Sequence, residues 1–156
     1  MNREIRDLLL AALDPALASV DPAFLRSGSY RSPAYEARVG ATTYRLEVVF
    51  KSADEAFSAD LAWGPPSTLS LDPASLTNAG SGSFRIDLLW SAGGSWWEVR
   101  APPPPAMARR SAADIFKQSA NRVTVECAAS QIPALVADFR DRVLHHVVPY
   151  VLRRPR

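Results

Sequence analysis

Seven charged side chains recur at alternating positions in the middle of this chain, and they are the residues best suited to chemistry. They are Arg45, Glu47, Asp60, Arg85, Asp87, Glu98 and Arg100. The simplest interpretation is a ladder of cross-strand ion pairs, each worth about 0.2–1 kcal/mol. The functional interpretation is a polar binding face for a partner protein or a small charged ligand, and these seven residues are our candidate site. A hydrolase that uses two of the carboxylates is a third interpretation.

The other reactive residue types do not form a recognisable constellation. His145 and His146 are adjacent, so on a helix they project roughly 100° apart and do not easily hold one ion. Cys127 is the single cysteine, and its apolar neighbours predict a buried thiol at the end of a strand. The glycine clusters at 80–82 and 92–95 run into predicted strands without a Lys, which indicates turns rather than phosphate loops. We therefore expect no metal site, no cofactor and no catalytic residue.

Four runs of alternating apolar residues must position the charged side chains. The runs are Tyr44/Leu46/Val48/Phe50, Phe57/Ala59/Leu61/Trp63, Phe84/Ile86/Leu88/Trp90 and Trp97/Val99. Strict alternation predicts strands with one dry and one wet face. With an earlier strand that ends at Val39 and a turn from Gly40 to Thr42, the runs predict an antiparallel sheet of about five or six strands. We expect Phe84–Trp90 and Trp96–Arg100 to form a hairpin.

The two ends of the chain have helical spacing and supply the cover that such a sheet needs. Ile5, Leu8, Leu9, Ala12 and Leu13 share one helical face. Asn2 is the expected N-cap of this helix, and Asp14-Pro15 predicts a break. The last helix is predicted to start at Ser130, with Pro133 in its first turn, and to kink or end near Val148 because Pro149 follows. Its apolar stripe comprises Ile132, Leu135, Val136, Phe139, Val143, Val147 and Tyr150.

The segments between the sheet and the last helix carry weaker signals. Residues 64–82 predict a surface loop with a helical turn near Ala74–Leu76. Pro102–Pro105 predicts a rigid polyproline spacer, with a ligand for proline-reading domains as the alternative. Ala112–Ala120 is a weak helix candidate, and Arg122–Cys127 is predicted as a strand. The whole pattern predicts one α+β domain over residues 1–156, with both terminal helices on one face of the sheet.

The composition is that of an ordinary globular protein, with 47% hydrophobic and 22% charged residues in 156. A net charge of +2 is too small to indicate a nucleic-acid or membrane partner. The lone cysteine fits a reducing compartment, and no apolar run is long enough for a signal sequence or a membrane span. We expect a cytoplasmic protein. Because Lys occurs only at Lys51 and Lys117, the arginine bias indicates a GC-rich bacterial genome.

One segment carries a resemblance to a known family. Ala23-Phe24-Leu25-Arg26-Ser27-Gly28-Ser29-Tyr30-Arg31 resembles the Gly-Phe-x-Lys/Arg-x-Gly-x-x-Tyr/Phe motif of a widespread bacterial domain of unknown function, although Ala23 replaces its usual Gly. Trp96-Trp97 and Val148-Pro149-Tyr150 are similar to later features of that family. The resemblance implies an N-terminal helix, a β-meander and a C-terminal helix, and it implies no known activity and no catalytic residues.

These patterns favour non-enzymatic recognition as the function. A small bacterial domain with a charged open sheet face is typical of an immunity protein or a defence-system component that binds a partner protein. The alternative is a small-molecule binder or enzyme with a pocket between sheet and helices, lined by Tyr30, Tyr44 or Trp96. A third possibility is a homodimer joined at an edge strand or across the open face.

Overall fold

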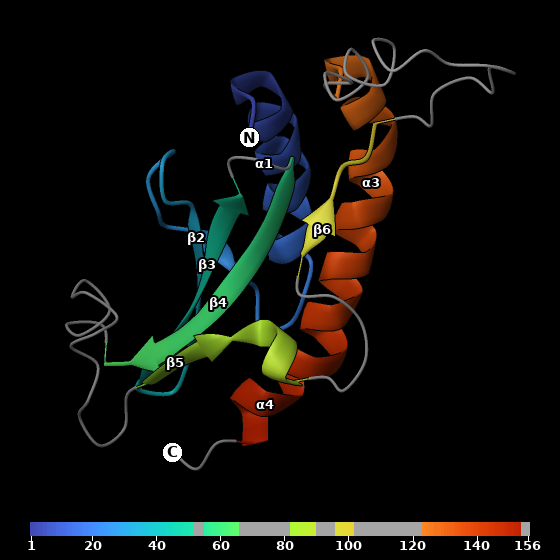
Figure 1. Ribbon diagram of the computed structural model, residues 1–156. Coiled ribbons are helices and arrows are strands. Elements are labelled where there is room, and N and C mark those ends of the chain that lie inside the picture. The colour runs from blue at the N-terminus through green and yellow to red at the C-terminus, as the bar shows by residue number, and fades with distance from the viewer. Residues whose placement is uncertain (52–54, 66–81, 90–95, 102–122, 154–156) are drawn as a thin grey trace, which may run out of the picture.

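The computed structural model of the chain describes residues 1–51, 55–65, 82–89, 96–101 and 123–153. In these residues an antiparallel sheet is covered by an N-terminal and a C-terminal helix that contact each other (Figure 1). The α+β prediction is therefore confirmed. The segments predicted at Ala74–Leu76, Pro102–Pro105 and Ala112–Ala120 lie outside the described residues.

The sheet has six strands, five of which run in the order β1-β2-β3-β4-β5. Their bounds are Leu25–Arg26 (β1), Ala34–Val39 (β2), Thr42–Lys51 (β3), Ala56–Gly64 (β4), Gly82–Arg85 (β5) and Trp97–Glu98 (β6). The predicted turn between β2 and β3 is confirmed, and Gly40 takes the positive φ of 62° that such a turn needs. The short edge strand β1 was not predicted, because two residues are too few to show alternation.

The predicted hairpin of Phe84–Trp90 with Trp96–Arg100 is wrong. After Arg85 the chain leaves the sheet and forms the short 3₁₀ helix η2 (Ile86–Leu89). β6 pairs instead with β4, at Ala56↔Glu98 and Phe57↔Trp97, whereas β5 pairs with the other half of β4. β4 is long enough to hold both short strands on one edge. The turn into η2 buries Ile86 and leaves Leu88 74% exposed.

Helix α1 (Arg3–Ala18) continues through Asp14-Pro15, so the predicted break there is wrong. The Asn2 cap is confirmed, since its side chain accepts a hydrogen bond from the Glu4 N–H at 2.9 Å. Continuing the helix buries Leu17 fully. The free energy gained by this burial exceeds the cost of the one main-chain hydrogen bond that Pro15 cannot donate. Asp14 does not cap a helix. It accepts a hydrogen bond from the Tyr35 hydroxyl at 2.8 Å.

Helix α3 (Val125–Arg142) begins earlier than expected, so Arg122–Cys127 is not a strand where it is described. Its N-cap is Thr124, which accepts from the Cys127 N–H at 3.2 Å. The predicted cap Ser130 lies inside the helix and donates to the Cys127 carbonyl. Helical and strand periodicity cannot be told apart over so few residues, which explains the error.

Of the two outcomes predicted near Val148, an end of the helix is wrong, because the chain stays helical to Arg153. A π-helical turn, η3 (Val143–Val147), joins α3 to α4 (Val148–Arg153). The Val148 N–H donates to the Val143 carbonyl. Pro149 has no N–H with which to continue the ordinary pattern, and the widened turn directly precedes it. Of the predicted apolar stripe, Ile132, Val136, Phe139, Val143 and Val147 are buried.

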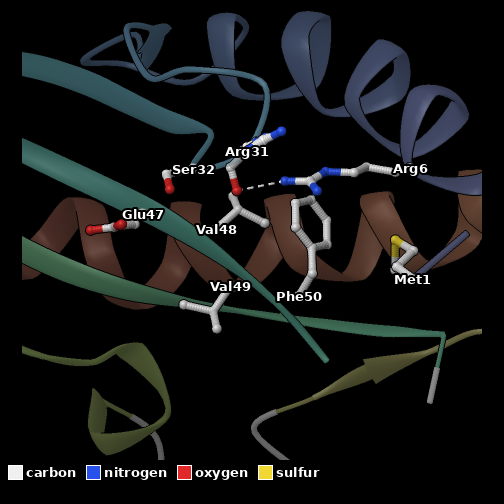
Figure 2. A pocket seen from close by; sticks show the side chains of 8 residues that line it. All are labelled: Met1, Arg6, Arg31, Ser32, Glu47, Val48, Val49 and Phe50. Carbon is white, nitrogen blue, oxygen red and sulfur yellow. Dashed lines mark hydrogen bonds between the residues drawn. The ribbon is translucent and has the colours of Figure 1, made fainter. Parts of the chain in front are cut away.

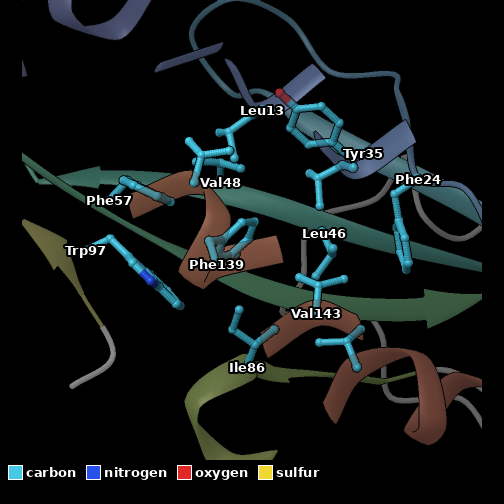
Figure 3. Close-up of a cluster of buried hydrophobic side chains, with 14 of the residues drawn as sticks. Leu13, Phe24, Tyr35, Leu46, Val48, Phe57, Ile86, Trp97, Phe139 and Val143 are labelled. Carbon is cyan, nitrogen blue, oxygen red and sulfur yellow. The ribbon is translucent and has the colours of Figure 1, made fainter. Parts of the chain in front are cut away.

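The core lies between the helices and the apolar phase of the strands, as Figure 3 shows. Phe57 of β4 stacks on Trp97 of β6 with ring centroids 5.5 Å apart. Phe139 of α3 meets the edges of both rings, at 5.5 Å and 4.8 Å. The Trp97 indole N–H donates to Asp138 at 2.7 Å, which ties β6 to α3. The aromatic residues of the strands are thus structural, and the opposite, polar phase forms the outer face of the sheet.

Candidate functional site

Three of the predicted site residues form one row across the outer face. The register places Glu47 of β3 opposite Asp60 of β4, and Asp60 opposite Arg85 of β5. Directly opposed side chains on one sheet face lie about 5 Å apart at Cβ. We call Glu47, Asp60 and Arg85 the carboxylate row. The sequence could show that each residue is in the polar phase, but only the register shows that they are neighbours.

Asp87 joins this row from outside the sheet. It lies in η2 rather than in a strand, and its carboxylate contacts the Arg85 guanidinium at 2.7 Å. The Arg85 side chain is half exposed, so solvent screens this pair and it contributes little to stability. The more important effect of the pair is that the Arg85 guanidinium binds Asp87. Among the described residues no cation lies within ion-pair distance of Glu47 or Asp60.

The other predicted site residues lie outside the row, Arg45 in the neighbouring row opposite Ala62 and Glu98 at the other end of β4. Arg45 is two residues from Glu47 on β3, and its guanidinium is 4.0 Å from Glu36. Glu98 is opposite Ala56 at the other end of β4 and pairs with Arg100 at 3.3 Å, where the Arg100 side chain is 80% exposed. Arg45 therefore matches the interpretation as a cross-strand ion pair, whereas Glu98 and Arg100 pair with each other within one segment. The row of Glu47, Asp60 and Arg85 does not match the ion-pair interpretation.

Electrostatics single out Asp60 within the row. Partial burial raises the pKa of the Asp60 carboxyl above its ordinary value, because a less hydrated site disfavours the charged form. The negative charge of Glu47 raises this pKa further, Arg85 opposes the rise, and Asp87 adds to it. The cation beside Asp60 is thus too weak to cancel burial and the two neighbouring carboxylates. A second cation placed here would stabilise the ionised pair.

A hollow of about 330 Å³ opens over the row. It is lined by Glu47, Asp60, Ala62, Ser83, Phe84 and Arg85. Ala62 and Ser83 face each other in the next row of the sheet, and their small side chains leave the space. Neither residue was predicted from the sequence to belong to the site. The signal that could have found them is the run of small residues in the polar phase directly beside the carboxylates.

An apolar area adjoins the row on the same face. Val49 lies opposite Ser58, and Val49 is 38% exposed whereas Ser58 is buried. Trp96, which directly precedes β6, is 37% exposed, and the Lys51 ammonium lies 6.0 Å from its ring centroid. Exposed tryptophan is enriched at the centre of protein interfaces.

The three aromatic residues predicted to line a ligand pocket lie in different environments and do not share one pocket. Tyr44 is buried in the core, whereas Tyr30 is 41% exposed and packs on the Arg6 guanidinium at 4.8 Å. Trp96 is on the outer face. The two hollows that we describe have other linings.

The remaining candidates for chemistry are held in structural contacts or lie apart. Cys127 is half-buried on the first turn of α3 rather than at a strand end, and its thiol accepts from the Gln131 amide at 3.0 Å. His145 and His146 lie in η3. In the described part of the chain, His, Cys, Asp and Glu form no group of three suited to a metal ion. No helix there has the length and hydropathy to cross a membrane.

The element order implied by the resemblance is present: an N-terminal helix, an antiparallel meander and a C-terminal helix. Comparisons of the chain with protein-family models, with curated proteins and with solved structures found no match.

Proposed function

We propose that this protein is a recognition module that binds a partner protein through the outer face of its sheet. The observation that carries the proposal is the pairing of Glu47 with Asp60 across β3 and β4, beneath a hollow of about 330 Å³. Two adjacent carboxylates with a raised pKa at Asp60 are unfavourable in the free protein. They become favourable when a positive group enters the hollow.

The partner group that fits is a lysine or arginine side chain. Its charge is complementary to Glu47 and Asp60, and its aliphatic stem can pack on Val49, which lies in the next row of β3 and is 38% exposed. Charged pairs that lose water at an interface contribute specificity and slow dissociation. An immunity or defence-system role is our prediction for the biological class, because a small domain with a charged binding face suits it.

A small cationic ligand is the second candidate function. The same hollow supports it, because a few hundred cubic ångströms is enough for an amine of modest size. In this case the ligand is a free small molecule, whereas in the first proposal the positive group is a side chain of a partner protein. A paired-carboxylate hydrolase is less well supported, because the row lacks a third group that positions a water or an acceptor.

The test uses the full chain as an affinity bait, followed by reconstitution with the protein that it retains. Wild type is compared with the Glu47→Gln/Asp60→Asn double variant by calorimetry with the purified partner. We expect the double variant to bind at least tenfold more weakly, since truncating one side of a desolvated charge pair costs about 2–5 kcal/mol. We also expect its affinity to depend less on salt.

The matched control is Glu98→Gln, which removes a carboxylate from the same face outside the hollow. It should bind the partner as wild type does. The proposal fails if the bait retains no partner, or if the double variant binds as tightly as the control. Saturable binding of N-acetyl-lysine methylamide by a chain that retains no protein would favour the small-ligand function instead.

A further inference from the structure

Strand β3 extends beyond its neighbour β2 on one edge of the sheet. The pairing of the two strands stops at Ala34↔Glu47, and one further bond runs from the Val48 N–H to the Pro33 carbonyl at 2.9 Å. β2 therefore has no residue to pair with Phe50. In an antiparallel ladder, alternate residues direct their N–H and C=O to the same side, so those of Phe50 face the same edge as those of Val48.

A second hollow, of about 430 Å³, lies along this edge (Figure 2). It is lined by Met1, Arg6, Arg31, Ser32, Glu47, Val48, Val49 and Phe50. One wall comes from α1, another from the loop that precedes β2, and the floor from β3. Uncovered strand edges are the sites at which proteins accept an additional extended segment.

Arg6 is held rigidly at one end of this hollow. Its guanidinium lies 4.1 Å from the ring centroid of Phe50 and 4.8 Å from that of Tyr30. One N–H donates to the Arg31 carbonyl at 2.7 Å. Contact with two aromatic rings and a main-chain bond restrict the orientation of the group before any ligand arrives, which lowers the entropic cost of binding.

The positive charge at this end is not neutralised within the described residues. Neither Arg6 nor Arg31 has a carboxylate of that part of the chain within ion-pair distance, and the Arg31 side chain is exposed. Glu47 lines the other end of the hollow, beyond Val48. An incoming carboxylate is therefore attracted to the Arg6 end and repelled from the Glu47 end, which fixes the position of an anionic ligand along the edge.

We propose that this hollow binds an extended peptide segment that carries a carboxylate. The peptide main chain adds to the uncovered part of the β3 edge, at the Val48 carbonyl and at the N–H and carbonyl of Phe50, and the carboxylate binds at the Arg6 and Arg31 guanidiniums. Both parts are needed: the edge recognises an extended backbone, and the two guanidiniums recognise its charge. This hollow shares Glu47 with the carboxylate row at one end, but its other end is positive, so the two sites accept opposite charges.

The test is a titration of the full chain with labelled hexapeptides of alternating Thr and Val. One peptide ends in a free carboxylate, a second is identical but amidated, and a third has the free carboxylate and N-methyl groups on the amides of one edge. Binding is followed by fluorescence anisotropy and by amide chemical shifts. We expect the free acid to bind about tenfold more tightly than either other peptide and to shift the amide signal of Phe50, whose N–H faces the open edge.

Arg31→Gln provides the protein-side test, because Arg31 is exposed and its side chain makes no ion pair with a described residue. It should abolish the preference for the free acid. Arg38→Gln is the matched control, since Arg38 is an exposed arginine at the far end of β2, opposite Thr43, and it should leave that preference unchanged.

Three results overturn the proposal. One is that wild type binds none of the peptides, and another is that it binds acid and amide equally. The third is that the N-methylated peptide or inorganic phosphate competes as well as the free acid, because either result shows an anion site without strand addition.

Discussion

Asp60 is unfavourably placed in the free protein, and this is the main residue-scale reason to regard the outer face as functional. Its carboxyl is partly buried beside Glu47, and Arg85 only partly offsets these effects on its pKa. The neighbouring polar residues do not share this condition, since Arg85 pairs with Asp87 and Arg100 with Glu98. Residues that lower the stability of the fold are typical of binding surfaces, where function requires them.

The pH dependence of stability tests this view of Asp60. The folded-state pKa is raised above the ordinary value of 3.8, so the folded chain holds this proton more tightly than the unfolded chain does. The contribution of Asp60 is absent well below pH 3.8, turns unfavourable as the pH rises through the raised pKa, and is constant above it. We therefore expect Asp60→Asn to be more stable than wild type at pH 7 and to lose this advantage in acid.

Urea unfolding at neutral pH and at about pH 3.5 measures the difference in the free energy of unfolding. Asp141→Asn serves as the control, since the Asp141 side chain is 60% exposed and its replacement should change stability by less than about 0.5 kcal/mol. A variant of Asp60 that is less stable than wild type at pH 7 would show that its charge stabilises the fold.

At the scale of elements, the loop between β1 and β2 determines the shape of the hollow at the β3 edge. The Ser27 and Gly28 N–H groups both donate to the Ala34 carbonyl, at 2.9 Å and 3.2 Å, so the loop folds back on the start of β2. This brings Arg31 beside α1, where its carbonyl accepts from Arg6. The motif that carries the family resemblance thus includes the wall of this hollow.

Gly28 is the residue of this loop that tolerates no side chain. A Cβ at Gly28 would overlap the Ala34 nitrogen and the Ser32 carbonyl oxygen, which are main-chain atoms that cannot rotate away. We expect Gly28→Ala to lower the free energy of unfolding by about 3 kcal/mol and to weaken binding of the free-acid peptide. Urea unfolding followed by circular dichroism measures the first effect.

Gly40→Asn is the matched glycine control. Gly40 has a φ of 62° in an exposed turn, and Asn accepts that conformation readily. The control should stay within about 0.5 kcal/mol of wild type. If Gly28→Ala is equally neutral, the loop does not hold the close main-chain packing described here.

At the scale of the whole molecule, one continuous core joins elements from both ends of the chain. Residues of α1, β2, β3, β4, β6, α3 and α4 all belong to the same buried cluster. Phe139 illustrates the connection, because its ring meets both Phe57 of β4 and Trp97 of β6. A core shared in this way favours unfolding as a single unit, as the predicted single domain requires.

The expected result is one cooperative unfolding transition. Far-ultraviolet circular dichroism, which reports on the helices, and tryptophan fluorescence, which reports mainly on the sheet, should give the same midpoint. Phe139→Ala should lower both midpoints together and cost about 3–5 kcal/mol. Leu152→Ala should change stability by less than about 0.5 kcal/mol, because Leu152 is 58% exposed. Separate midpoints for the two probes would contradict a single domain.

The sequence alone determined the fold class, because alternation and helical spacing are local properties that burial imposes on each element separately. It predicted correctly that the apolar phase of the strands is core and that both ends of the chain are helical. It also placed Glu47 and Asp60 in the polar phase. Its errors at Asp14 and at Ser130 concern helix boundaries, where local capping signals compete with burial that depends on distant residues.

Only the tertiary structure decided which of these residues meet. The register makes Glu47, Asp60 and Arg85 neighbours, and the route of β6 to β4 takes Glu98 away from them. Both depend on pairing between segments far apart in the chain, which no local pattern encodes. The same holds for the uncovered edge of β3, since a strand's neighbours are set by where every other strand ends. Function at either surface is therefore a property of the assembled sheet.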